Sequence, residues 1–138
     1  MKASTFYRAA AVVLFLFAIG HTLGCREVDP AWGLDQLLTS MQSTHFTVQG
    51  FTRTYWDFFV GAGFSVGALY AFAAVLAWQL GGLPAESLRG LRVTAWSFAL
   101  CFAVITLVSA QHLFWIPIVN SSLATACLIA AAWRSSRT

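Results

Sequence analysis

Long apolar runs separated by polar segments dominate the sequence. Four runs are long enough to cross a bilayer, because a helix rising about 1.5 Å per residue needs roughly 20 residues to span a hydrocarbon core of about 30 Å. We expect transmembrane helices at about residues 6–24, 55–80, 93–114 and 116–133. Since consecutive spans run in opposite directions, the pattern predicts one all-α integral membrane domain over residues 1–138, folded as a four-transmembrane-helix antiparallel bundle.

The first run has a second interpretation, as a secretory signal. A basic beginning and Gly24-Cys25 at the end are typical of signal peptides. A lipoprotein signal usually has leucine three residues before the cysteine, where this chain has Thr22, and His21 interrupts the apolar run. We therefore expect residues 6–24 to be retained as a helix.

One long polar connection, residues 25–54, separates the first two spans. Within it, apolar residues recur at the i, i+3, i+4, i+7 spacing of a short amphipathic helix. These residues are Leu34, Leu37, Leu38 and Met41. With Trp32 beside it, such a helix would lie on the membrane surface, or it would pack as a lid over the end of the bundle. Both alternatives place an amphipathic helix in the first outer loop.

Local signals mark the ends of the later spans. Thr54 with Asp57 three residues on predicts a capping box at the start of the second span. The run Gly81-Gly82-Leu83-Pro84 predicts its end, because glycine favours the position after a helix and proline cannot continue one. Pro117 suits the first turn of the last span.

Composition supports the membrane assignment. Of the 138 residues, 59% are hydrophobic and 9% are charged, whereas soluble domains have roughly 45–50% and about 25%. No basic cluster is interleaved with exposed aromatic residues, so we expect no nucleic-acid partner. Two of the three cysteines, Cys101 and Cys127, fall in apolar spans and leave Cys25 over, so a disulfide framework has no support.

The distribution of basic residues predicts the orientation. If both termini are cytoplasmic, the inner segments hold most of the arginine and lysine, as the positive-inside rule requires. The inner basic residues are Lys2, Arg8, Arg89, Arg92, Arg134 and Arg137, and the outer ones are Arg26 and Arg53. The chain is therefore expected to be a multi-pass protein with both termini cytoplasmic and the lipid bilayer as its main partner.

This orientation gathers polar side chains at the outer end of the bundle. The candidate ligand-binding residues there are His21, Tyr55, Trp56, Asp57, Gln111, His112, Trp115 and Asn120. Ionisable groups near hydrocarbon usually face the bundle interior or water, and imidazole titrates near neutral pH. We expect His21 and Asp57 to lie within direct or one-water hydrogen-bond reach, where they would serve a bound molecule or a proton transfer.

Each candidate also has a structural alternative. His21 would donate to a backbone carbonyl, Asp57 would cap the second span, and His112 would be an interfacial residue at a helix end. The histidines are scattered singly, without the i, i+4 spacing that places two metal ligands on one helix. No metal and no cofactor is therefore predicted, and no catalytic residue is assigned.

Glycines inside the spans predict close helix packing. The candidate packing residues are Gly20, Gly24, Gly61, Gly63 and Gly67. A slot for a lipid tail or a quinone ring is the alternative. Glycine faces directed outward would instead favour a membrane-protein partner or a homo-oligomer.

Several motifs carry a family resemblance. Gly20-His21-Thr22-Leu23-Gly24 and Arg53-Thr54-Tyr55-Trp56-Asp57-Phe58 resemble an uncharacterised family of small bacterial four-helix integral membrane proteins, and Trp78-Gln79-Leu80-Gly81-Gly82-Leu83-Pro84 fits as well. The chain is more distantly similar to DoxX-like proteins. The resemblance implies the fold and the bacterial inner membrane, and it implies no activity.

Three functions fit these observations. The first is binding of a lipid, a quinone or another apolar small molecule at the outer mouth, without catalysis. The second is a small membrane enzyme that uses His21, Asp57 and His112 for proton transfer. The third is an accessory subunit of a larger membrane complex.

Overall fold

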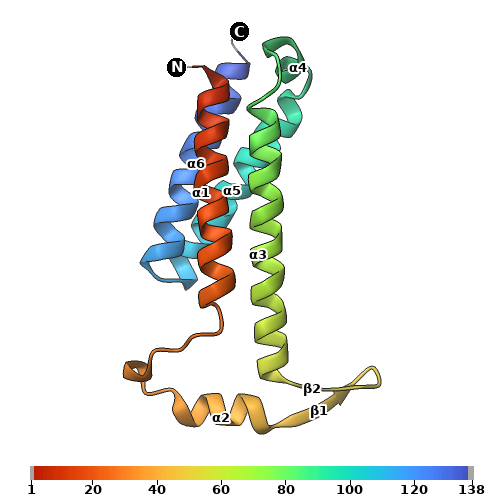
Figure 1. Cartoon of the computed structure of the whole chain (residues 1–138), viewed down its shortest axis with the longest axis vertical. Coiled ribbons are helices and arrows are strands. Elements are labelled where there is room, and N and C mark those ends of the chain that lie inside the picture. Colours follow the sequence, from red (N-terminus) through yellow and green to blue (C-terminus); the bar gives the residue numbers. More distant parts are fainter. Residues whose placement is uncertain (1, 137–138) are drawn as a thin grey trace. The chain divides into compact units, whose positions relative to one another are not determined.

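The computed structural model describes residues 2–136, which form two compact units (Figure 1). Unit 1 holds the residues up to Phe17 and those from Tyr70 onward, and unit 2 holds Ala18–Leu69. Each unit is described by itself below. Arg137, one of the predicted inner basic residues, lies outside the described residues.

The chain is all-α apart from one short hairpin. The elements are α1 (Ala3–Gly24), η1 (Pro30–Trp32), α2 (Asp35–Ser43), β1 (His45–Val48), β2 (Phe51–Thr54), α3 (Tyr55–Leu80), α4 (Ala85–Gly90), α5 (Arg92–His112) and α6 (Trp115–Ser135). Four of them, α1, α3, α5 and α6, are long and apolar enough to cross a membrane, with mean hydropathies of 1.6 to 2.0. The four predicted spans are confirmed as helices, with ends that shift by a few residues.

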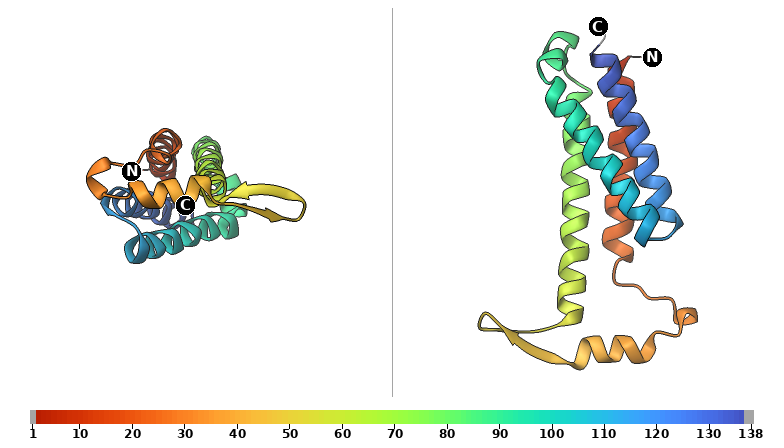
Figure 2. Two further views of the ribbon diagram at one scale, coloured as in Figure 1. Left: turned by 90° about the horizontal axis from the view of Figure 1, so that it is seen from below. Right: turned by 180° about the vertical axis from the view of Figure 1, so that it is seen from behind.

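Unit 1 contains parts of α1 and α3 together with α4, α5 and α6. The Arg8 guanidinium lies over the Trp78 ring, 4.2 Å from its centroid, and joins the beginning of α1 to the end of α3. The Tyr70 ring packs edge-on against Phe102, with centroids 5.5 Å apart, and joins α3 to α5. Helices α5 and α6 run side by side in opposite directions (Figure 2). Within unit 1 the long helices thus form an antiparallel bundle.

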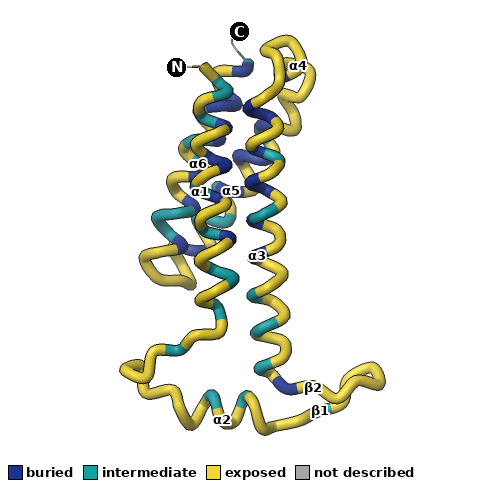
Figure 3. The backbone as a smooth tube through the Cα atoms, viewed as in Figure 1, coloured by how far each residue is buried: buried dark blue, intermediate teal, exposed yellow. Residues whose placement is uncertain are grey.

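The core of unit 1 is built mainly from small side chains. Its buried alanines are Ala10, Ala11, Ala73, Ala74, Ala77, Ala95, Ala99, Ala124, Ala131 and Ala132. Large apolar side chains of the same helices face outward, among them Leu16 (62% exposed), Phe72 (66%) and Leu107 (64%). Figure 3 colours the buried positions of this unit dark blue and the exposed positions yellow. Small residues inside and large apolar residues outside are typical of helices that pack in lipid.

Hydroxyl groups are tolerated in this core because carbonyls of the same helix accept their hydrogen bonds. The Ser121 hydroxyl, fully buried, donates to the carbonyl of Pro117 at 2.7 Å. The Thr106 hydroxyl donates to Phe102 O at 2.8 Å and lies 3.0 Å from Thr125 Oγ1. Bonds to the carbonyl four residues earlier satisfy a hydroxyl without any partner helix. Pro117 stands in the first turn of α6, as predicted.

In unit 2, α1 and α3 approach each other at two glycines. A Cβ added at Gly63 would lie 3.0 Å from Cys25 Sγ, and one added at Gly67 would collide with Thr22 Oγ1. A larger side chain at Gly67 would crowd α1, and one at Gly63 would displace Cys25, the residue that follows α1. Two of the predicted packing glycines, Gly63 and Gly67, therefore lie at a close contact.

The other three candidate packing glycines make no close contact among the described residues. A Cβ at Gly20, Gly24 or Gly61 would meet no atom within 4 Å. Successive residues turn by about 100° around a helix, so a residue two positions from a contact residue points to the opposite side. Gly61 stands two positions before Gly63, and Gly24 two positions after Thr22, and both therefore point away from the contact.

A β-hairpin occupies part of the segment predicted to be a polar connection. Strands β1 and β2 pair antiparallel from His45 opposite Thr54 to Val48 opposite Phe51. The two-residue turn Gln49-Gly50 has positive φ at both positions, 50° and 83°, as the tight turns that suit strand twist require. Within the segment predicted as a polar connection, His45 therefore begins a strand.

The amphipathic helix predicted in the same segment is present as α2. Leu34 precedes its first turn as the N-cap residue, without a capping side chain. No residue of α2 is buried, and Leu37 is 54% exposed. Of the apolar stripe, Leu34 and Leu37 are exposed and Leu38 and Met41 are half-buried.

Helix α3 ends at Leu80, as predicted, and Gly81 follows it in a role other than a cap. Among the described glycines only Gly33 and Gly50 have positive φ, so Gly81 is not a left-handed cap. A Cβ at Gly81 would lie 3.2 Å from both Ser4 O and Tyr7 Cβ. This glycine allows the backbone of α1 to approach closely.

Candidate functional site

The predicted residues in unit 2 begin with a helix cap. Strand β2 ends at Thr54, and α3 starts at the next residue. The Thr54 N–H donates to Asp57 Oδ2 at 2.8 Å, and the Asp57 N–H donates to Thr54 Oγ1 at 3.1 Å. Each residue thus satisfies a backbone donor that the first helical turn leaves without a partner. Arg53 and His45 add electrostatic attraction to the carboxylate. The capping box is confirmed, and with it the structural alternative for Asp57.

His21 contacts the same helix farther along. Its Nε2 lies 3.1 Å from Gly63 O, and because a carbonyl only accepts, Nε2 carries the proton of this bond. Gly63 stands six residues beyond Asp57, or about 9 Å along the axis of α3. The structural alternative for His21, donation to a backbone carbonyl, is confirmed. The bonds of His21 and Asp57 stand at different levels of α3 and give no support to a His21–Asp57 pair.

Tyr55 and Trp56 belong to aromatic contacts at the start of α3. The Phe46 ring of β1 lies 5.2 Å from the Tyr55 ring and stacks on Phe58, with centroids 5.7 Å apart. Trp56 stacks on Phe59 at 5.5 Å. Phe46 therefore anchors the hairpin on α3. The apolar, β-branched and aromatic alternation around Gln49-Gly50 is the sequence signal that could have identified it.

The remaining candidates belong to unit 1. Gln111, His112 and Trp115 are exposed around the turn between α5 and α6, and Trp115 is 75% exposed. Helix α5 ends at His112, as its structural alternative proposed, two residues before the predicted end of the span. The eight predicted residues are thus divided between the two units.

Asn120 bonds to a neighbouring helix within unit 1. Its Nδ2 donates to Val13 O on α1 at 3.2 Å. Its Oδ1 is buried and accepts no hydrogen bond from residues 2–136. The buried hydroxyl of Tyr7 is likewise without a bond of good geometry, although the Ser135 side chain is close to it. Both groups lie inside the bundle of unit 1.

Residues 2–136 contain no group of three His, Cys, Asp or Glu side chains that could hold a metal ion. Cys25, Cys101 and Cys127 are free thiols. What the arrangement provides chemically is helix capping and hydrogen bonding to carbonyls.

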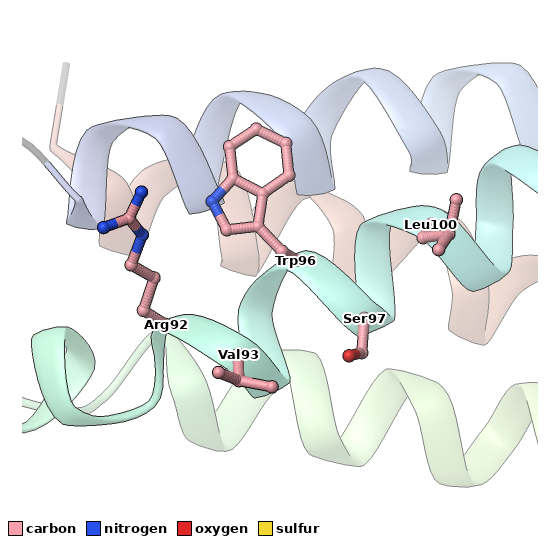
Figure 4. A pocket seen from close by; sticks show the side chains of 5 residues that line it. All are labelled: Arg92, Val93, Trp96, Ser97 and Leu100. Atoms are coloured by element: carbon pink, nitrogen blue, oxygen red, sulfur yellow. The ribbon is translucent and has the colours of Figure 1, made fainter.

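A hollow on α5 was missed by the sequence analysis. It has a volume of about 610 Å³, is open to the outside and is lined by Arg92, Val93, Trp96, Ser97 and Leu100 (Figure 4). These positions share one face of a single helix, because residues four apart lie above one another. A basic residue followed four positions later by tryptophan at the start of an apolar span could have revealed it.

Comparisons of the chain with protein-family models, with curated proteins and with solved structures give no match. The resemblance carried by the three motifs stays a prediction.

Proposed function

We propose that the chain is a small multi-pass protein of the bacterial inner membrane that binds a lipid, a quinone or another apolar molecule without transforming it. One observation carries the membrane location: the helices bury mainly alanine, while most of their large apolar side chains face outward. In water this outward surface would be a large aggregation-prone patch. In lipid it is the ordinary surface of a helix.

The charges support cytoplasmic termini. Five basic residues stand near helix ends of unit 1, against one acidic residue there, Glu86. They are Lys2, Arg8, Arg89, Arg92 and Arg134. Four of the five acidic residues of the chain belong to unit 2. The positive-inside rule then favours the cytoplasm for the α4 connection and the outer side for α2 and the hairpin.

Unit 2 supports a position at the outer membrane surface. Helix α2 has no buried residue, and Trp32 beside it is 59% exposed. Phe51 near the hairpin turn is 60% exposed. Amphipathic helices and exposed aromatic rings settle where headgroups meet acyl chains. The surface-lying alternative for α2 is therefore preferred to the lid.

Binding is preferred to catalysis because the proposed acid–base pair lacks support. The Asp57 carboxylate caps α3, and His21 donates to a carbonyl. A general base must instead reach the proton of a substrate. The accessory-subunit alternative keeps one observation in its favour, the open surroundings of Gly20, Gly24 and Gly61.

Cysteine labelling tests the membrane topology. In a variant that lacks Cys25, Cys101 and Cys127, we expect Ser40→Cys to react with an impermeant maleimide from outside intact cells and Ser87→Cys to react only after permeabilisation. Labelling of position 87 alone in intact cells would overturn the orientation. Extraction of either variant by alkaline carbonate would overturn the membrane location itself.

Solvent extraction tests the binding function. Protein purified in a mild detergent should retain an apolar molecule that mass spectrometry identifies, at an amount comparable to the protein. A helical membrane protein of similar size, purified in parallel, measures the non-specific background. Equal amounts in both samples would contradict the binding function and leave the topology unaffected.

A further inference from the structure

The face of α5 that carries the hollow combines one cation with an apolar surface. Arg92 is the first residue of α5 and is exposed, and it forms no hydrogen bond or ion pair with another described residue. Val93 is 80% exposed and Leu100 is 66% exposed. In Figure 4 the guanidinium of Arg92 and the half-buried indole of Trp96 rise on the same side of the helix.

From these observations we infer that this face, the Arg92 groove, binds an anionic phospholipid of the surrounding membrane. The inference goes beyond the proposed function and rests on its membrane location. The phosphate would pair with the Arg92 guanidinium, since phosphates are preferred partners of arginine. One acyl chain would lie along Val93, Ser97 and Leu100.

The depth of these residues fits a lipid. Arg92 is the first residue of a membrane-spanning candidate, so its guanidinium stands at the level of headgroups, where long basic side chains settle. Leu100 lies eight residues farther, or about 12 Å along the helix, which is acyl-chain depth. Trp96 stands between them, at the level where indole rings prefer to lie.

The charge around the groove favours an anionic over a zwitterionic headgroup. The first turn of α5 contains no acidic side chain. Arg89 in α4, three residues before Arg92, is also exposed. A free anion would be attracted by the same charges but would gain no binding energy from the apolar face. The groove therefore favours a lipid.

Native mass spectrometry of the whole chain released from detergent tests the inference. We expect phosphatidylglycerol to bind about fivefold more tightly than phosphatidylcholine of the same chain length, the effect of roughly one interfacial charge. Arg92→Gln should remove this preference, and Trp96→Leu should weaken binding of both lipids. Arg53→Gln, which removes an exposed arginine of unit 2, is the control and should change neither.

Three results would overturn the inference. They are equal affinity of the two lipids for the unaltered chain, an unchanged preference in Arg92→Gln, and full displacement of phosphatidylglycerol by millimolar inorganic phosphate. The last would show an anion site without a lipid. Arg92 forms no bond within the described chain, so a lost preference in a variant with unaltered melting reports binding and not folding. None of these results bears on the carbonate and cysteine tests of the membrane location.

Discussion

Helices α1 and α3 take part in both units, and they are held differently in each. In unit 1 they belong to a bundle with α5 and α6, whose core contains ten buried alanines and the buried side chains of Tyr7 and Leu14. In unit 2 the buried residues are Ala18, Thr54 and Gly67. The same kind of helix is therefore fixed by a shared core in one place and by a few point contacts in the other.

The difference indicates which part of the chain is stabilised by its own packing. A closely packed core tolerates little change in volume, because its neighbours cannot relax. Unit 2 depends on two glycines, one capping box, the bond from His21 to Gly63 O and aromatic stacks, so it opens locally at lower cost. Regions of low local stability are also those that respond to surroundings, which here would be headgroups or a bound molecule.

Overpacking the core of unit 1 should have the largest effect. Ala124 is fully buried in α6, and Ala124→Leu should lower the free energy of unfolding by about 3 kcal/mol because the added atoms have no space. Thermal unfolding in detergent, followed by circular dichroism, measures the change. Ala126, exposed on the same helix, provides the control, since Ala126→Leu should melt with the unaltered chain. Equal melting of both variants would mean that unit 1 has no rigid core.

Overpacking the helix contact of unit 2 should cost less. Gly67→Leu would collide with Thr22, and we expect a loss of about 2 kcal/mol. Gly61→Leu on the open side of α3 should leave stability unchanged or raise it slightly, because leucine favours a helix. Hydrogen exchange measured by mass spectrometry should show the loss in residues 18–69. If Gly61→Leu is the more harmful variant, Gly61 contacts a partner molecule.

Removing the cap should have a smaller, local effect. Thr54→Ala deletes the hydroxyl that accepts from the Asp57 N–H, and losing such a cap costs about 1 kcal/mol. Faster hydrogen exchange in the first turn of α3 is the expected sign, while α5 and α6 stay protected. Thr54→Ser keeps the hydroxyl and should restore protection. Faster exchange throughout unit 1 would show that the two units unfold together.

The smallest expected effect concerns the hydroxyl pair of unit 1. Coupling between Thr106 and Thr125 should be about 0.6 kcal/mol, the average for hydrogen bonds between membrane helices. A double-mutant cycle with Thr106→Val and Thr125→Val measures this coupling. Because the Thr106 hydroxyl also donates to Phe102 O, coupling near zero would show that the backbone bond is sufficient.

Hydropathy was sufficient to predict the four long helices, because a run of about 20 apolar residues has few alternatives. The capping box and α2 followed from fixed spacings. The hairpin was missed since Gln49-Gly50 was not recognised as a turn between strands, although Gly50 is a strong signal.

The candidate site was harder to predict for a physical reason. Sequence places His21 and Asp57 near the same end of the spans, but it does not say which way each side chain points. That depends on helix rotation, which packing at Gly63 and Gly67 determines. The same rotation explains why Gly20, Gly24 and Gly61 were assigned a contact that they do not make.

The bond from Asn120 to Val13 has a consequence for synthesis. Its partners are 107 positions apart, so at roughly 5–20 residues per second the ribosome needs about 5–20 seconds between them. During that delay the first helix has already emerged without its later partner. The Val13 carbonyl then accepts a hydrogen bond only from its own helix. A nascent chain stalled after His112 should therefore be digested by protease more readily than the finished chain, and its bundle can close only when the last helix arrives.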